Sequence, residues 1–124
     1  MPVTRISKES LEDLLRGKVK EDATCVLKFY SNECHLCHAL QDYFVGISDL
    51  EKYRDLHFFA YNIDDNPKIE KELGFKGVPT IFVIHSNIGN RPATLRLLPE
   101  PEKPNDATWY KVRDIKSFID KEAL

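Results

Sequence analysis

The chain has no long hydrophobic run, few cysteines and no excess of charge of either sign, and each absence excludes a class of protein. Its longest purely apolar stretch near the middle, Ile81-Phe82-Val83-Ile84, is far shorter than the roughly 20 residues that cross a bilayer. The net charge is -2, so no basic surface favours nucleic acid or an anionic membrane as a partner. Three cysteines, two of them close together, do not form the framework of a disulfide-rich secreted protein.

The N-terminal residues show no signal peptide, because Met1-Pro2-Val3-Thr4-Arg5 leads directly into a charged helical pattern. The sequence therefore predicts a cytoplasmic location, where thiols are kept reduced. A length of 124 residues suits one domain with one core, residues 1–124. Within it we expect residues 99–108 to be a surface-loop insertion, because their prolines and charges do not pack into a core.

Hydrophobic patterns predict strands alternating with helices. We expect strands near residues 24–30, 56–63, 80–84 and 94–98, which are rich in β-branched and aromatic side chains. Helices are expected over 8–16, from Cys34 onward, from an Asx cap at 64–67 to 73, and over 111–122. The second helix carries its apolar side chains on roughly one side: Leu36, Leu40, Tyr43, Phe44 and Ile47. The order predicts an α/β fold with a central mixed sheet flanked by helices: first strands parallel, C-terminal hairpin antiparallel.

The motif Cys34-His35-Leu36-Cys37 follows directly on a predicted buried strand and opens a predicted helix. A helix N-terminus has unpaired N–H groups and a positive dipole, which lower the pKa of a thiol placed there. Residues at i and i+3 of a helix share a face, so the two sulfurs come close to disulfide distance. We expect Cys34 to be the exposed sulfur and Cys37 the buried one.

The same residues are compatible with three other interpretations. Cys34-His35-Leu36-Cys37-His38 also matches the pattern of c-type haem attachment, which would require export. Cys25, with the motif's cysteines and histidines, could supply zinc ligands, but structural zinc sites draw on two separated ligand pairs. A fold with inert cysteines is the third alternative. Cys25 by itself is expected to be a small core residue.

Several segments together resemble the thioredoxin family. They are the strand 26–30, the cysteine pair, Asn62-Ile63-Asp64, Gly77-Val78-Pro79-Thr80 and the final helix with Phe118-Ile119. The resemblance implies a thioredoxin-like fold and thiol–disulfide oxidoreductase activity. It also implies a cis Pro79 close to the two sulfurs, with the backbone of Val78 pairing with an extended substrate.

The chain departs from the family pattern around the cysteines. Lys28 stands where thioredoxins usually bury an aspartate, and Ala60 stands where a lysine partner of that aspartate is common. His35 between the cysteines would stabilise the Cys34 thiolate when protonated, which makes the disulfide more oxidising, and Glu33 acts in the opposite sense. We therefore single out His35, Glu33 and Lys28 as residues that tune the pKa values of the cysteines.

The resemblance implies that Cys34 attacks a protein disulfide and Cys37 resolves the mixed disulfide, without a cofactor or metal. The partners implied are protein disulfide substrates and a thioredoxin-reductase-like enzyme or small thiol for recycling; neither nucleic acid nor membrane is expected, and a monomer is. Val78, Pro79 and Trp109 are expected to form the substrate surface. The alternative is a thioredoxin-like binding module whose Cys-x-x-Cys is incidental.

Overall fold

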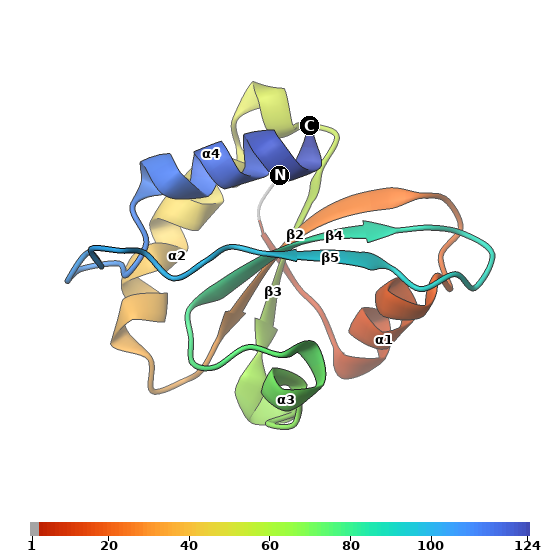
Figure 1. Ribbon diagram of the computed structural model, residues 1–124, viewed down its shortest axis with the longest axis horizontal. Helices are drawn as coiled ribbons and strands as arrows, with labels where there is room; N and C mark the ends of the chain where they lie inside the picture. Colours follow the sequence, from red (N-terminus) through yellow and green to blue (C-terminus); the bar gives the residue numbers. More distant parts are fainter. Residues whose placement is uncertain (1–2) are drawn as a thin grey trace.

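One mixed sheet of five strands forms the centre of the protein in the computed structural model, which describes residues 3–124 (Figure 1). The strands run in the order β1-β3-β2-β4-β5 across the sheet. Their bounds are β1 Thr4–Arg5, β2 Ala23–Tyr30, β3 His57–Asn62, β4 Thr80–Ser86 and β5 Thr94–Leu97. β3 pairs in parallel with β1 and β2, whereas β4 pairs antiparallel with β2 and β5. The predicted mixed sheet is confirmed.

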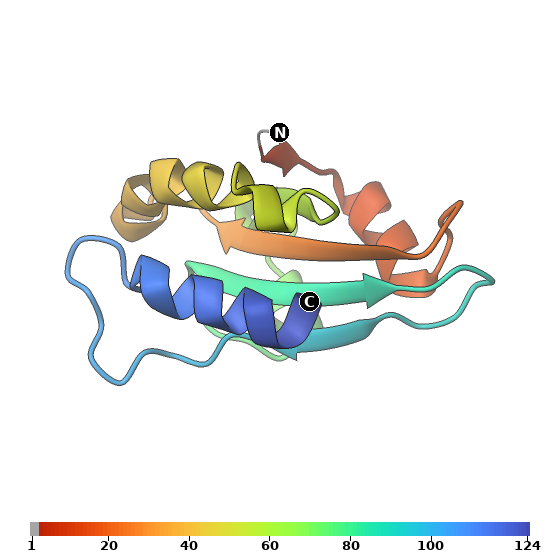
Figure 2. The same ribbon diagram turned by 90° about the horizontal axis from the view of Figure 1, so that it is seen from above.

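Helices cover both faces of this sheet. α2 (His35–Ser48) and α4 (Val112–Ala123) lie on one face, and α1 (Lys8–Arg16) and α3 (Ile69–Leu73) lie on the other (Figures 1 and 2). Two short 3-10 helices, η1 (Glu51–Tyr53) and η2 (Ile63–Asp65), flank β3 in the chain. None of the helices in residues 3–124 is long and apolar enough to cross a membrane.

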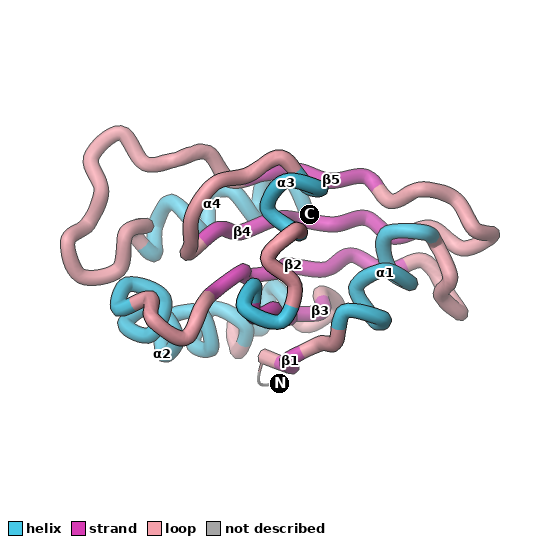
Figure 3. Tube along the Cα trace, turned by 90° about the horizontal axis from the view of Figure 1, so that it is seen from below, coloured by secondary structure: helices cyan, strands magenta, loops and turns pink. Residues whose placement is uncertain are grey.

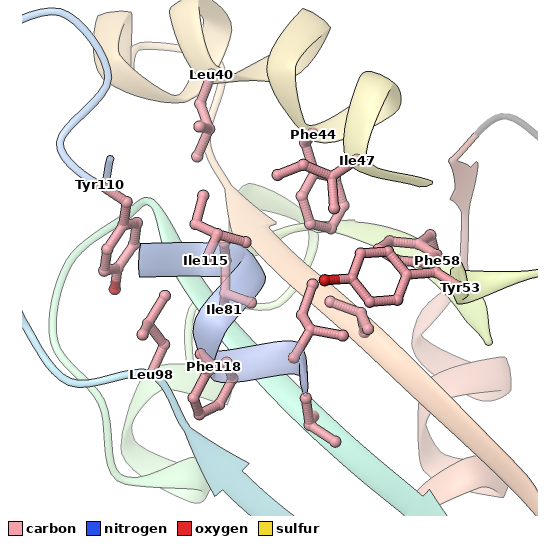
Figure 4. Close-up of a cluster of buried hydrophobic side chains, with 13 residues drawn as sticks. Leu40, Phe44, Ile47, Tyr53, Phe58, Ile81, Leu98, Tyr110, Ile115 and Phe118 are labelled. Carbon is pink, nitrogen blue, oxygen red and sulfur yellow. The ribbon is translucent and has the colours of Figure 1, made fainter. Parts of the chain in front are cut away.

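The alternation of side chains along β2 divides the core into two clusters. Val26 belongs to the cluster under α2 and α4, whereas Leu27 and Phe29 belong to the cluster against α1 and α3. Figure 4 shows the first cluster, where Phe44 of α2 meets Phe58 of β3 with ring centroids 5.6 Å apart. β2 is therefore buried on both faces, as expected for a strand whose residues are mostly apolar in succession.

Three details differ from the sequence prediction. β1 was not predicted, because two residues are too short for a periodic pattern to appear. The residues 64–67 do not cap a helix: Asp64 and Asp65 belong to η2, Asn66 is its C-cap, and α3 begins only at Ile69. Tyr43 was placed on the buried side of α2 but is 55% exposed, because it lies beyond the edge of the stripe formed by Leu40, Phe44 and Ile47.

The ends of α1 follow the sequence signals. The Ser7 Oγ accepts a hydrogen bond from the Ser10 N–H at 3.1 Å, which satisfies one free donor of the first turn. Gly17 ends the helix with φ +75°, in the left-handed region that glycine adopts without strain. A Cβ on Gly17 would also approach backbone atoms of Asn87 and Arg91 too closely. Gly17 thus allows the loop before β5 to pack on the end of α1.

Candidate functional site

The cysteine motif stands where β2 ends and α2 begins. β2 ends at Tyr30, and Cys34 is the N-cap of α2, with extended backbone angles of φ −90° and ψ 101°. The start of α2, the start of β4 and the loop that leads into α4 lie at the same end of the molecule (Figures 1 and 3). The fold thus brings together three segments that are distant in the sequence.

Cys34 and Cys37 form a disulfide with their Cα atoms 5.2 Å apart. The Cys37 N–H donates a hydrogen bond to the Cys34 Sγ at 3.0 Å, so the sulfur occupies the capping position of the helix. Cys34 is partly exposed, and Cys37 is 1% exposed. The expectation that Cys34 is the accessible sulfur and Cys37 the buried one is confirmed. Once the disulfide is reduced, the helix N-terminus favours a thiolate at Cys34.

A cis peptide bond joins Val78 and Pro79 beside the disulfide, as the resemblance implied. The Val78 carbonyl oxygen lies 3.6 Å from the Cys34 Sγ. The turn before it is fixed at two points: the Thr80 Oγ1 donates to the Gly77 carbonyl at 2.7 Å, and the Gly77 N–H donates to the Glu70 carboxylate at 2.6 Å. The backbone next to the sulfur is therefore held in place by α3 and β4.

Asn32 fastens the loop before Cys34 to the end of β3, which the sequence analysis did not foresee. Its N–H donates to the Asp64 carboxylate at 2.9 Å, and its side-chain oxygen accepts from the Asn62 amide at 2.9 Å. Its carbonyl oxygen lies 2.9 Å from the Nε2 of His38. Asn62 and Asp64 carried part of the family resemblance, but nothing in the sequence paired them with Asn32. We infer that Asn32 positions the cysteine loop.

Lys28 of β2 is packed against α2 and is only 4% exposed. Its Nζ lies 5.3 Å from the centre of the Phe44 ring and 5.9 Å from that of Tyr30. Within residues 3–124 no carboxylate forms an ion pair with it, and burial lowers the pKa of Lys28 to about 8. Ala60 is its neighbour in β3, so the site holds one buried positive charge, without the aspartate and lysine that the family pattern would place there.

Cys25 behaves as a core residue. It is buried in the cluster against α1 and α3, and burial raises the pKa of its thiol to about 12. A thiol of this kind stays protonated and unreactive near neutral pH. Cys34 and Cys37, which form the disulfide, are therefore the candidate redox pair.

The other predicted site residues lie at the edges of the site. Glu33 and His35 are exposed on either side of Cys34, and no hydrogen bond or ion pair within the described chain joins them to another side chain. Trp109 is partly buried against the core under α2 and α4, and two backbone hydrogen bonds of 2.8 and 2.9 Å tie it to Asn105. The roles assigned to these three residues stay predictions. No cluster of three or more His, Cys, Asp or Glu residues in 3–124 could hold a metal ion.

Comparisons with known proteins agree with this geometry. The family model described as Thioredoxin matches residues 3–95. The chain is 30% identical over 86 residues to thioredoxin F2, chloroplastic, of Arabidopsis thaliana, a match that covers 68% of this chain and 44% of that protein. The chain thus spans less than half the length of this relative. It is 26% identical over 98 residues to thioredoxin-3, mitochondrial, of Saccharomyces cerevisiae, covering 74% of this chain and 76% of that protein.

A solved structure has the same fold. It is described as the complex of ferredoxin:thioredoxin reductase and thioredoxin f2, and its similar chain superposes with a TM-score of 0.67 at 24% identity, covering 97% of this chain and 94% of that one. Together with the family match, the Cys34–Cys37 pair at disulfide distance supports thiol–disulfide oxidoreductase activity. Fold, cysteine pair, cis-proline and family match agree in one conclusion: this chain belongs to the thioredoxin family.

Proposed function

We propose that the protein reduces disulfides in other proteins, with Cys34 as the nucleophile and Cys37 as the resolving thiol. The observation that carries the proposal is the unequal setting of the two sulfurs. Cys34 is accessible at the N-terminus of α2 and beside the Val78 carbonyl, whereas Cys37 is buried in the first turn. Only Cys34 can meet a disulfide on another protein, and only Cys37 is placed to attack it afterwards.

The reaction proceeds in two exchanges. In the first, the Cys34 thiolate attacks one sulfur of the substrate disulfide; the Cys34–substrate bond forms, the substrate bond breaks, and the released substrate thiolate takes up a proton. In the second, the Cys37 thiolate attacks the Cys34 Sγ, which forms the intramolecular disulfide and releases the second substrate thiol. The substrate gains two electrons and two protons, and the dithiol of this protein loses them.

The two cysteines can be separated by substitution. Cys34→Ser should abolish reduction of the disulfides of insulin, because no accessible nucleophile remains. Cys37→Ser should instead accumulate mixed disulfides, because attack survives and resolution does not. Cys25→Ala is the matched control and should keep full activity, since Cys25 is buried away from the site. Equal activity in all three variants would contradict the proposal and favour a binding module.

The charged neighbours of Cys34 are proposed to set the reduction potential. His35 is the first residue of α2, where proline is tolerated, so His35→Pro removes the imidazole without breaking the helix. A positive charge there would stabilise the Cys34 thiolate, and hence the reduced protein. The variant should therefore have a more negative potential against a glutathione buffer. An unchanged potential would assign the effect to Glu33, Lys28 or the helix terminus.

Substrates are proposed to bind across the end of the sheet where the three segments meet. The backbone of Val78, in the turn held by Thr80 and Glu70, offers hydrogen bonds to an extended chain next to Cys34. Trp109, on the loop before α4, supplies a large rigid ring on the other side of the groove. Glu33 stands where thioredoxins carry an apolar tryptophan, so this second ring would replace that contact.

We propose that a reductase of the thioredoxin-reductase class, or a small thiol, returns the disulfide to the dithiol. The proposal is supported by the solved complex of ferredoxin:thioredoxin reductase with thioredoxin f2, because one chain of that complex has the fold of this chain. We further propose that the protein works as a monomer in the cytoplasm. Reoxidation of NADPH by the protein with a thioredoxin reductase, compared with reduction by glutathione, distinguishes the two electron donors.

A further inference from the structure

A cavity lies behind the disulfide, between α2 and the part of the sheet formed by β1, β3 and β2. Its volume is about 290 Å³. Cys37 and Phe44 line it from α2, Lys28 and Tyr30 from β2, and Arg5 from β1. β1 and α2 lie on the same side of the molecule, away from α3 (Figures 2 and 3). The cavity is thus next to the buried sulfur, and neither Val78 nor Pro79 lines it.

The charges around this cavity are all of one sign. Its charged lining residues, Arg5 and Lys28, are both positive, and no Asp or Glu of residues 3–124 lines it. Neither Arg5 nor Lys28 forms an ion pair within the described chain. The Tyr30 ring is shared by both cations, with the Arg5 Cζ 5.8 Å and the Lys28 Nζ 5.9 Å from its centre.

The buried ammonium is poorly compensated. Lys28 is 4% exposed, and its ammonium donates no hydrogen bond to an acceptor within residues 3–124. The contacts described for it are the Phe44 and Tyr30 rings. Ring contacts offset only part of the cost of removing an ammonium from water. An anion in the cavity would supply the missing partner, and the apolar walls around Phe44 would contact an apolar body attached to it.

We propose that this cavity binds a small organic carboxylate, whose charge pairs with Lys28 and Arg5 and whose apolar part packs against Phe44. The size of the cavity, near the lower end of the range for ligand sites, suits a single ring or a short branched chain. Binding requires no thiol chemistry, so it is measurable in the oxidised protein and does not rest on the proposed function.

Benzoate is a suitable probe, with benzamide as its neutral counterpart. Titration calorimetry on the oxidised protein should detect benzoate, with benzamide at least tenfold weaker. Amide NMR shifts should change at Cys37, His38 and β1. Inorganic phosphate should bind at least tenfold more weakly than benzoate, because it has no apolar part. Equal binding of benzoate and benzamide, or tighter binding of phosphate, would overturn the proposal.

Substitutions locate the charge. Lys28→Met should weaken benzoate binding by about ten- to a hundredfold, since it removes a charged partner of the carboxylate. Arg5→Met should weaken benzoate binding severalfold. Because Arg5 is exposed, this substitution leaves the core intact, and it tests the site even if Lys28→Met does not fold. Lys20→Met is the matched control: it removes the same charge from an exposed position before β2 and should leave the affinity unchanged. Unchanged affinity in both Lys28→Met and Arg5→Met would refute the site.

The pH dependence gives a further readout. Burial places the pKa of Lys28 near 8, so a carboxylate meets a full positive charge below that pH and loses it as the pH rises. The other titratable or charged side chains that face the cavity are Arg5, Tyr30 and His38, because Cys37 is held in the disulfide and does not titrate. Benzoate affinity should fall as the pH rises from 7 to 9.5 in the wild-type protein and change much less in Lys28→Met. An affinity that stays constant across this range would contradict the role of Lys28.

Discussion

Lys28 shows at the scale of one residue how a fold tolerates an unfavourable side chain. Its pKa is about 8 in the folded protein, compared with an ordinary value of 10.5, and the cause is burial. A difference of that size corresponds to about 3 kcal/mol by which burial penalises the charged form. Between pH 8 and 10.5 the unfolded chain binds more protons than the folded one, so this residue's contribution to stability rises with pH. Below pH 8 the buried ammonium destabilises the folded protein by the full amount.

Removing this charge should therefore stabilise the protein, and more so at neutral than at alkaline pH. Lys28→Met keeps the apolar stem and omits the ammonium, as when a buried ion is replaced by an apolar residue of similar volume. We expect the free energy of unfolding in urea to rise by up to about 3 kcal/mol at pH 7. At pH 10 the gain should be at most a small part of that.

The comparison of the two pH values isolates Lys28 from other groups that titrate in alkali. Cys25 has a raised pKa in both proteins, so its effect cancels in the difference. Lys20→Met is the control for a surface lysine and should change stability by less than about 0.5 kcal/mol at either pH. A gain for Lys28→Met that is the same at pH 7 and pH 10 would mean that packing, rather than charge, is responsible.

The positions and burial of site residues were predictable where they depend on neighbours in the sequence. The helix N-cap position of Cys34 follows from the strand before it and the helix after it, and so does the burial of Cys37 one turn later. The sequence could not show what surrounds Lys28, because its neighbours Phe44 and Ala60 come from α2 and β3. Nor could it show the role of Asn32, whose partners are about thirty residues away.

At the scale of an element, a single glycine can decide how a helix ends and what packs against it. Gly17 ends α1 in the left-handed region, and a Cβ there would overlap the carbonyl oxygens of Asn87 and Arg91. Gly17→Ala should lower the free energy of unfolding by about 2–4 kcal/mol, the sum of backbone strain and overpacking. Chemical denaturation measures this directly. A loss below about 1 kcal/mol would mean that the loop moves away freely.

Gly46 provides the opposite case in the same protein. It lies inside α2, is exposed, and a Cβ there would meet no atom within 4 Å. Gly46→Ala should raise stability by about 0.5–1 kcal/mol, because glycine loses more conformational freedom than alanine in a helix. The two variants make the same chemical change, and the opposite signs are the test. Destabilisation by both would contradict the account of α2.

The elements were predicted best where their patterns are long. The three longest strands, α1 and α4 carry apolar patterns over several residues, and each was placed within about two residues. The start of α2 was placed within one residue, whereas its end was not predicted. β1 has two residues and exists only because β3 offers a free edge, which no local pattern reveals. Asp64 and Asp65 fold into η2, where the Asn62 side chain caps a 3-10 turn in place of the expected helix start at 64–67.

At the scale of the whole molecule, the topology decides which residues can act together. Because β4 pairs antiparallel with β2, its first residue, Thr80, lies opposite Phe29 at the end of β2, just before the start of α2. The loop before α4 lies at this end of the sheet as well (Figure 1). Family resemblance predicted the meeting of Cys34 with Pro79, because it supplies the topology that a residue pattern does not. It placed Trp109 only by counting back from α4.

Trp109 reports on whether this third segment belongs to the site. It is the only tryptophan in the chain, so its fluorescence has one source. If its ring borders the groove, reducing the Cys34–Cys37 disulfide should change the intensity or wavelength of emission, because a disulfide and two thiols differ in polarity and in quenching. Cys34→Ser is the matched control: it cannot form the bond, and the same reductant should leave its emission unchanged.

The bonds around Trp109 make the outcome informative in either direction. Its backbone is in the left-handed region with φ 66° and pairs with Asn105, so the ring has a fixed starting position against the core under α2 and α4. A redox-dependent signal would therefore mean that the site communicates with this fixed ring, not that a mobile ring has moved. Unchanged emission in the wild-type protein on reduction would mean that Trp109 only closes the core beneath the proline-rich loop. The substrate groove would then consist of the cysteine loop and the Val78–Pro79 turn alone.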